Sequence, residues 1–375
     1  MSITGSILGA LACALLLGGG AALAAEPPPS SATPADRSIA MVLSLHRHAI
    51  YESADGKECP DGKNVSQYEQ YLAQFPSELA RAAHEVRFGY GYGNRGPNGE
   101  NVTAAPMSVE DLIPFKPSQS AVAPGVDLDD RVDADDYDSP DGRKGIDNQF
   151  NRILGCVEAF RKGGLSHYSI NRNLHLLSQR MIFVISDVDD LRNDPQVTVR
   201  TYRGLDPINY STDDKATPGG TQRLDRERGA RFEVLTTGRI VDGVLLTDPA
   251  DLNMPWRPNT GANDYKLRGA RLRVSLSPKL GGYVAQGHLG GFADIPTWWA
   301  GFMKAYGGRM QDVSNLSAPS FYRALIKYAD GYPDAAGRNT AASIEYEVEF
   351  VSIHIVPGAV AAPARLASRD PGTSP

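Results

Sequence analysis

The sequence predicts a mainly β protein with some helix, in which an antiparallel β-sandwich-like C-terminal part follows a mixed helix and loop region. Three observations lead to this prediction. The chain of 375 residues has 41% hydrophobic residues, enough to build a core. Its 38 Gly and 26 Pro make it rich in turn formers, which argues against a helical bundle. After Gln179 the apolar pattern alternates with a period of two, and Gly and Pro separate the runs, which favours antiparallel strands over βαβ units.

The first folded part is expected to mix one strand with helices and long loops. Met41 to Tyr51 is predicted as the strand, and Ser66 to Ala73 as a short helical run. The clearest predicted helix is Asn148 to Lys162, with Asp147 as its N-cap and Gly163-Gly164 as its stop. Its apolar stripe has the spacing of one helix face and consists of Phe150, Ile153, Leu154, Val157 and Phe160.

The second part is predicted to consist mainly of strands. The expected strands are Met181 to Val188, Gln196 to Tyr202, Ala230 to Thr237, Ile240 to Thr247, Lys266 to Leu276, Tyr283 to Leu289 and Ser343 to Val356. Two helices interrupt them, Ile295 to Tyr306 and Ser320 to Ala329. Trp298 and Trp299 are adjacent in the first of these helices, so their rings point about 100° apart. Both rings can pack in the core, or one can face a partner or a sugar.

The ends of the chain indicate export. Ile7 to Ala25 is an apolar stretch that ends in the small-residue site Ala22-Leu23-Ala24, which is typical of a secretory signal peptide cleaved after Ala24 or Ala25. A membrane anchor is the alternative, but the glycines of this stretch make it a poor anchor helix. We expect a signal peptide at 1–25, a flexible leader at 26–37, the mixed region at 38–180, the β-sandwich-like domain at 181–356 and a disordered tail at 357–375. The mature protein is then periplasmic or secreted and has no membrane span.

Export determines how the cysteines are interpreted. Cys59 and Cys156 remain after cleavage, and two cysteines in an oxidising compartment most simply form one disulfide. Two buried free thiols are the alternative.

The segment Asp127 to Asn148 is the most informative stretch for function. It contains nine Asp and no Glu, against Arg131, Arg143 and Lys144, so its net charge of −6 equals that of the whole chain. Such a density of like charges is unfavourable unless a cation lies among them, and Ca²⁺ binds six to eight oxygen ligands of this kind. No register of the segment fits an EF-hand loop, so we expect an irregular calcium loop. Its candidate ligands are Asp127, Asp129, Asp133, Asp135, Asp136, Asp138 and Asp141.

A solvated acidic loop is the alternative interpretation of this segment, because most charge runs simply face water.

Other motifs carry less information. Gly91 to Gly96 matches GxGxxG but neither follows a strand nor opens a helix, as a dinucleotide site requires. His46 and His48 share one face of a strand end and could begin a metal site, but the further ligands and the alternating βα pattern of a barrel hydrolase are missing.

The function expected from these observations is that of a secreted, calcium-stabilised β-rich protein that binds a ligand or partner without catalysis. The ligand could be a carbohydrate or another exported protein, and the acidic net charge argues against nucleic acid. The alternative is an exported hydrolase or lyase that acts on a polysaccharide or other polymer. Acid–base pairs for it could come from Asp187 with Asp189, or from Glu345, Glu347 and Glu349, which share one strand face. A solvated strand edge explains these three glutamates more simply.

Overall fold

The computed structural model describes residues 37–65, 72–88, 98–101, 104–108, 110–112, 114–164, 180–213, 215–227, 229–256, 263–306 and 317–356. The predicted signal peptide, the leader up to residue 36, the tail from residue 357 and most of the run from Ser66 to Ala73 lie outside these residues. Within them, none of the helices is both long enough and apolar enough to cross a membrane.

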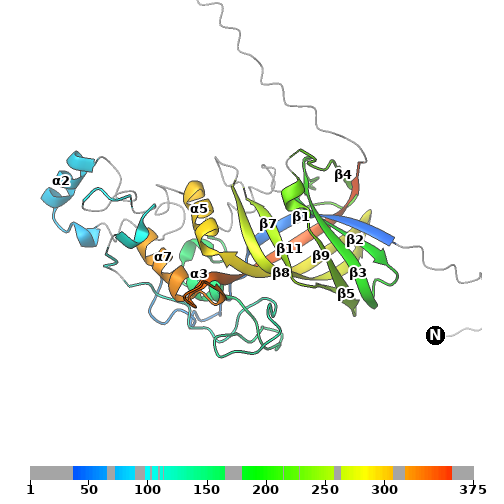
Figure 1. The fold of residues 1–375 in the computed structure, drawn as a ribbon, viewed down its shortest axis with the longest axis horizontal. Helices are drawn as coiled ribbons and strands as arrows, with labels where there is room; N and C mark the ends of the chain where they lie inside the picture. The colour runs from blue at the N-terminus through cyan, green and yellow to red at the C-terminus, as the bar shows by residue number, and fades with distance from the viewer. Residues whose placement is uncertain are drawn as a thin grey trace, which may run out of the picture. The chain divides into compact units, whose positions relative to one another are not determined.

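Antiparallel strands make up most of the described fold (Figure 1). They are β1 (Arg37–His48), β2 (Arg180–Val188), β3 (Asp194–Gly204), β4 (Gly220–Gln222), β5 (Leu235–Val241), β6 (Val244–Thr247), β7 (Ala250–Trp256), β8 (Asn263–Lys279), β9 (Gly282–Asp294), β10 (Gly331–Pro333) and β11 (Asn339–Ile355). The mainly β prediction is therefore confirmed. The predicted strand Ala230 to Thr237 instead begins with the short helix η3 (Ala230–Phe232), and its strand starts only at Leu235.

Eight of these strands close into an antiparallel barrel in the order β1-β2-β3-β5-β6-β8-β9-β11, and β1 pairs again with β11. The sandwich-like arrangement predicted from sequence is thereby corrected to a closed sheet. The physical reason lies in β1, which comes from the region before residue 180 and pairs along both of its edges. The division into domains at 38–180 and 181–356 stays a prediction, although β1 shares a sheet with the later strands.

The interior of the barrel is a packed apolar core. On β11, Tyr346, Val348 and Phe350 belong to this core and are at most 2% exposed. The residues between them alternate to the outer face, as the period of a strand requires. This alternation places Glu345, Glu347 and Glu349 in one row outside the barrel.

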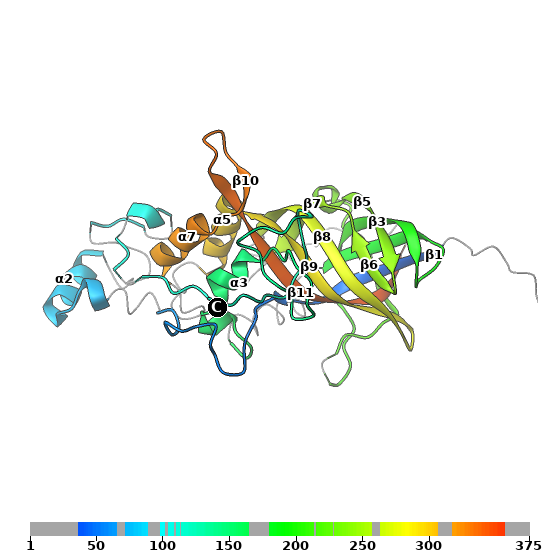
Figure 2. The same cartoon turned by 90° about the horizontal axis from the view of Figure 1, so that it is seen from below.

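Helices gather at one end of the barrel, where both views show α3, α5 and α7 side by side (Figures 1 and 2). The described helices are α2 (Glu78–Phe88), η1 (Pro106–Ser108), α3 (Gln149–Leu154), η2 (Glu158–Phe160), η3, α5 (Ile295–Tyr306) and α7 (Ala318–Lys327). The ring of Trp298 lies 5.0 Å from that of Phe150 and 5.7 Å from that of Phe321. Trp298 and Trp299 are 1% and 7% exposed, so both rings pack in the core.

The long helix predicted from Asn148 to Lys162 is wrong in extent, because α3 ends at Leu154 and only the 3-10 turn η2 follows. The carbonyls of Arg152 and Cys156 accept hydrogen bonds from the amides of Ser118 and Asn64, both at 2.8 Å. Partners from distant loops thus replace the next turn of helix. The predicted apolar stripe is nevertheless buried in full.

Candidate functional site

The Asp-rich segment is an irregular loop held to the barrel by buried apolar residues. Val126 and Leu128 pack against Phe292 of β9, and Tyr137 forms an isolated bridge with Ile146. The N-cap of α3 is Asn148 rather than the predicted Asp147, since the Asn148 side chain accepts a hydrogen bond from the amide of Asn151. The side chain of Asp147 is therefore not used as the cap.

Two of the predicted metal ligands lie against basic side chains. Asp138 forms an ion pair with Lys144 at 2.5 Å, and Asp141 forms one with Arg143 at 3.1 Å. Hydrogen bonds from Ser139 and Arg143 lower the pKa of Asp141 to about 2. These two carboxylates already have a positive partner within the loop.

Three further predicted ligands lie elsewhere in the loop. Asp136 accepts a hydrogen bond from the amide of Asp133 at 2.5 Å, and the carboxylate of Asp135 lies 3.4 Å from the side-chain amide of Gln149. Burial raises the pKa of Asp136, and the charges of Asp135, Asp133 and Asp129 add to the rise. Among the described residues, none of these three belongs to a group of carboxylates that could share an ion.

Asp127 and Asp129 do converge, and their third member is Asp147. One carboxylate oxygen from each lies within 4.8 Å of the others. We call these three residues the acidic cluster. Two oxygens on opposite sides of a Ca²⁺ ion, each at about 2.4 Å, are about 4.8 Å apart, so this spacing fits a single calcium ion. A set of carboxylates without His or Cys selects a hard cation over a transition metal.

The electrostatics of the acidic cluster show the effect of burial among like charges. Asp147 is 7% exposed, and its carboxylate accepts a hydrogen bond from the amide of Leu128 at 2.7 Å. Burial raises its pKa to about 8, and the charges of Asp136 and Asp129 contribute to the rise. Burial also raises the pKa of Asp127. A nearby cation would reverse both shifts, because it favours the ionised carboxylate.

A fourth carboxyl lies directly behind the acidic cluster. Glu345 of β11 is fully buried, and it accepts a hydrogen bond from the amide of Val126 at 3.1 Å, while the carbonyl of Val126 accepts from the amide of Asp147. Gly290 leaves the room for it, because a Cβ there would fall 1.8 Å from Oε1 of Glu345. Burial raises the pKa of Glu345, and the charge of Asp147 adds to this effect. The solvated edge expected for Glu345 is therefore wrong.

A groove of about 370 Å³ lies beside the Asp-rich segment, at the end of β1. We call it the β1 groove. Pro124 and Pro140 of the loop region form part of its lining, together with Tyr51, Phe160 and His48. Its charged lining residues are Arg47, Glu52, Lys162 and Glu347. Arg47 and Glu347 form an ion pair across neighbouring strands.

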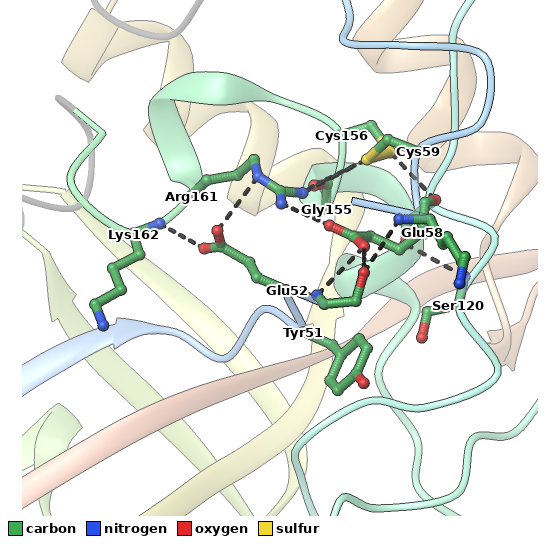
Figure 3. Close-up of polar contacts among 12 residues, drawn as sticks. Tyr51, Glu52, Glu58, Cys59, Ser120, Gly155, Cys156, Arg161 and Lys162 are labelled. Atoms are coloured by element: carbon green, nitrogen blue, oxygen red, sulfur yellow. Dashed lines mark hydrogen bonds and ion pairs between the residues drawn. A yellow bond between two sulfur atoms is a disulfide. The ribbon is translucent and has the colours of Figure 1, made fainter. Parts of the chain in front are cut away.

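Arg161 is the centre of a polar network that includes Glu52 and Lys162, two lining residues of the β1 groove (Figure 3). Its guanidinium lies 3.4 Å from the carboxylate of Glu52 and 2.5 Å from that of Glu58, whose side chain is 1% exposed. Burial acts to raise the pKa of Glu58, but hydrogen bonds from Ser53 and Arg161 outweigh it and lower the pKa to about 2. Glu52 also accepts from the amide of Lys162 at 2.5 Å.

The predicted disulfide is confirmed and belongs to the same network. Cys59 and Cys156 are bonded, with their Cα atoms 5.6 Å apart. Arg161 lies 3.5 Å from the sulfur of Cys59 and donates to the carbonyl of Gly155 at 2.5 Å. The disulfide thus joins the loop that carries Glu58 to the turn after α3.

His46 and His48 point into the end of the barrel, on one face as the sequence indicated. Their rings lie 4.1 and 4.9 Å from that of Tyr346, whose hydroxyl is 2.8 Å from that of Tyr265. Burial lowers the pKa of His46 to about 4. This histidine is therefore neutral at physiological pH and part of an aromatic core. Among the described residues, the group that could hold a metal ion is the acidic cluster.

A second cavity of about 690 Å³ lies further along the outer face, and Glu349 and Gln286 contribute to its lining. Lys215 and Lys279 stand at the same cavity. Glu349 accepts a hydrogen bond from Gln286. Glu347 and Glu349 therefore belong to different cavities, although they are two residues apart on one strand face.

Sequence reasoning missed three functional features. The sequence predicts Asp147 as a helix cap and groups Glu345 with its solvent-facing neighbours, and it gives no indication of the β1 groove. Only the fold of the segment brings Asp147 together with Asp127 and Asp129. No signal in the sequence marks Arg161 as the centre of its network.

No protein-family model, no curated protein and no solved structure matches this chain.

Proposed function

We propose that this chain is an exported, calcium-stabilised β-rich protein that binds a ligand in the β1 groove without catalysis. The observation that carries the proposal is the convergence of Asp127, Asp129 and Asp147 within 4.8 Å. None of the three has an ion pair with a basic side chain among the described residues, unlike Asp138 and Asp141. A cation would supply the missing positive charge, and carboxylate oxygens suit Ca²⁺.

Glu345 supports the proposal independently. A carboxyl that is fully buried beside another acid is costly unless it is protonated or faces a positive charge. Its Oε2 atom has no hydrogen-bond partner among the described residues. A calcium ion at the acidic cluster would reduce the repulsion that Asp147 exerts on it.

Export is supported by the disulfide. Such bonds persist in oxidising compartments and are rare in the cytosol. The predicted signal peptide at 1–25 is consistent with this compartment, and N-terminal sequencing of the secreted protein would test cleavage after Ala24 or Ala25.

Melting curves test the calcium site. External calcium sites typically bind at about 10⁻⁴–10⁻³ M, so 10 mM Ca²⁺ should stabilise the folded chain by about 1.4–2.7 kcal/mol relative to chelator. We expect a rise of several degrees in the melting temperature. Magnesium should give a smaller rise, because it needs tighter octahedral geometry.

Matched variants locate the effect. Asp127→Asn with Asp129→Asn should abolish the calcium shift, whereas Asp138→Asn should retain it, because Asp138 pairs with Lys144. Equal melting temperatures of the unmodified protein in calcium and in chelator would contradict the proposed site and leave the solvated acidic loop.

A second candidate function, a polysaccharide hydrolase or lyase, is favoured by one observation. The β1 groove has two carboxylates, Glu52 and Glu347, close to the rings of Tyr51 and Phe160. Each carboxylate is, however, already engaged by an arginine, Glu347 by Arg47 and Glu52 by Arg161. New reducing ends released from a polysaccharide by the unmodified protein, but not by Glu347→Gln, would support this second candidate.

A further inference from the structure

The β1 groove offers flat apolar surfaces to a ligand. Tyr51 is only partly buried, and its backbone is held in place by a hydrogen bond from its amide to the side chain of Asn151 at 2.8 Å. Pro140 is exposed and Pro124 is partly buried. Phe160 lies deeper, 5% exposed. A tyrosine ring in such a place can stack on an apolar ligand face while its hydroxyl reaches a polar group.

The charges of the groove are balanced. Two basic residues, Arg47 and Lys162, and two acidic residues, Glu52 and Glu347, line it. Arg47 is paired with Glu347, and Glu52 receives both the guanidinium of Arg161 and the amide of Lys162. A groove of this kind has no excess charge to attract an anion or a cation. It presents donors and acceptors next to each other, held by ion pairs.

These features suit a ligand that combines apolar faces with many hydroxyl groups. Each hydroxyl can donate to a carboxylate and accept from a guanidinium or ammonium group. Small-ligand sites combine apolar and aromatic lining with a few fixed polar groups, and a volume of about 370 Å³ lies in their usual range.

We propose that the β1 groove binds a neutral carbohydrate, with a sugar ring stacked on Tyr51 and its hydroxyls bonded to the Arg47–Glu347 pair and to Glu52. This inference rests on the proposed function, because it names the ligand class of that same groove. It assigns no chemistry to the two glutamates.

Binding of defined oligosaccharides to the purified protein tests the proposal. The neutral probes are cellotetraose, maltotetraose and chitotetraose. Tetragalacturonate and a tetramer of chitosan serve as the anionic and cationic probes. Titration calorimetry in calcium and in chelator should show that at least one neutral probe binds, and more tightly than both charged probes.

Variants place the binding in the groove. Tyr51→Ala should weaken the affinity for the neutral oligosaccharide by about five- to tenfold, which is the loss expected when one aromatic stacking contact is removed. Tyr51→Phe should change it by less than about threefold, since the ring remains. Glu347→Gln should weaken it by about fivefold, as expected for one hydrogen bond. Glu349→Gln is the matched control, because it lies on the same strand face but lines the other cavity, and it should leave the affinity unchanged.

Four results would overturn the proposal. Three concern the sugars: binding of the charged probes alone, no binding of any neutral probe, and neutral binding that Tyr51→Ala leaves intact. The fourth is capture of another exported protein at this groove that Tyr51→Ala blocks. The calcium shift of the melting temperature, measured on the same samples, separates the two proposals. If that shift persists while no neutral sugar binds, the carbohydrate inference alone fails.

Discussion

Replacing Asp147 by Asn should stabilise the calcium-free protein, although it removes a member of the acidic cluster. The carboxyl of Asp147 has its pKa raised from 3.8 to about 8, mainly by burial. At pH 7 the folded chain therefore keeps this proton, while the unfolded chain has lost it. One pKa unit corresponds to about 1.4 kcal/mol, and pH 7 lies about three units above the ordinary pKa that Asp147 has in the unfolded chain. Relative to low pH, where both states hold the proton, Asp147 therefore lowers the free energy of unfolding at pH 7 by at most about 4 kcal/mol.

The sign of the pH dependence follows from the same shift. Below about pH 4 both states hold the proton, and the group does not affect stability. Between about pH 4 and pH 8 the folded state binds more protons than the unfolded state, so stability falls as the pH rises, by up to about 1.4 kcal/mol per unit. In Asp147→Asn this contribution is absent, and the amide oxygen can still accept the hydrogen bond from Leu128.

Urea unfolding at pH 5, 7 and 8 in chelator measures the effect. We expect the free energy of unfolding of Asp147→Asn to be higher than that of the unmodified protein at pH 7 and 8, and the two values to converge at pH 5. Asp138→Asn is the control. Its free energy of unfolding should differ from that of the unmodified protein by the same amount at pH 5, 7 and 8. In calcium the unmodified protein should be the more stable of the two, because the ion binds the ionised carboxylate of Asp147 and displaces the proton from it. A chelated variant that is less stable than the unmodified protein at pH 8 would refute this reasoning.

Two further predictions concern the network of Figure 3. Replacing both Cys59 and Cys156 by Ser removes the cross-link between two residues that are 97 positions apart in the sequence. The unfolded chain then gains conformational entropy, and the free energy of unfolding should fall by up to about 4–5 kcal/mol. Denaturant unfolding checks this, and a loss below about 1 kcal/mol would contradict it. Arg161→Met leaves the buried Glu58 without its guanidinium and should cost about 3–5 kcal/mol. Lys144→Met, at the exposed ion pair with Asp138, should cost less than about 1 kcal/mol on the same assay.

The sequence predicted the elements of this fold better than their closure. The period of two after residue 180 identified most strands, because one face of each strand is buried and the other is not. Nothing in that pattern shows that β1, more than 130 residues upstream of β2, pairs with β2 on one edge and β11 on the other. Such pairing depends on contacts between distant parts of the chain, whereas alternation is a local property.

The candidate site shows the same limit in a sharper form. The pattern of alternate residues correctly places Glu345, Glu347 and Glu349 on one strand face. Their environments differ completely, because the Asp-rich segment covers Glu345 and leaves Glu347 and Glu349 in separate cavities. Burial by a distant loop is a tertiary effect, and it turns three similar glutamates into one buried residue and two partly exposed residues with different partners.

The acids of the Asp-rich segment are likewise distinguished by what each one contacts. Asp130 is paired with Arg271 of β8, 141 positions later in the chain, whereas among the described residues neither Asp127 nor Asp129 forms an ion pair with a basic side chain. A solvated loop would gain nothing from holding these two carboxylates together beside a buried acid, since the repulsion between the two is relieved when the loop moves apart. Here the backbone prevents such movement, because Val126 and Leu128 are buried against β9 and the amide of Leu128 holds Asp147. Repulsion that the fold maintains rather than relaxes is what a cation-binding site requires before the ion arrives. The calcium titration of Asp147→Asn tests this interpretation directly.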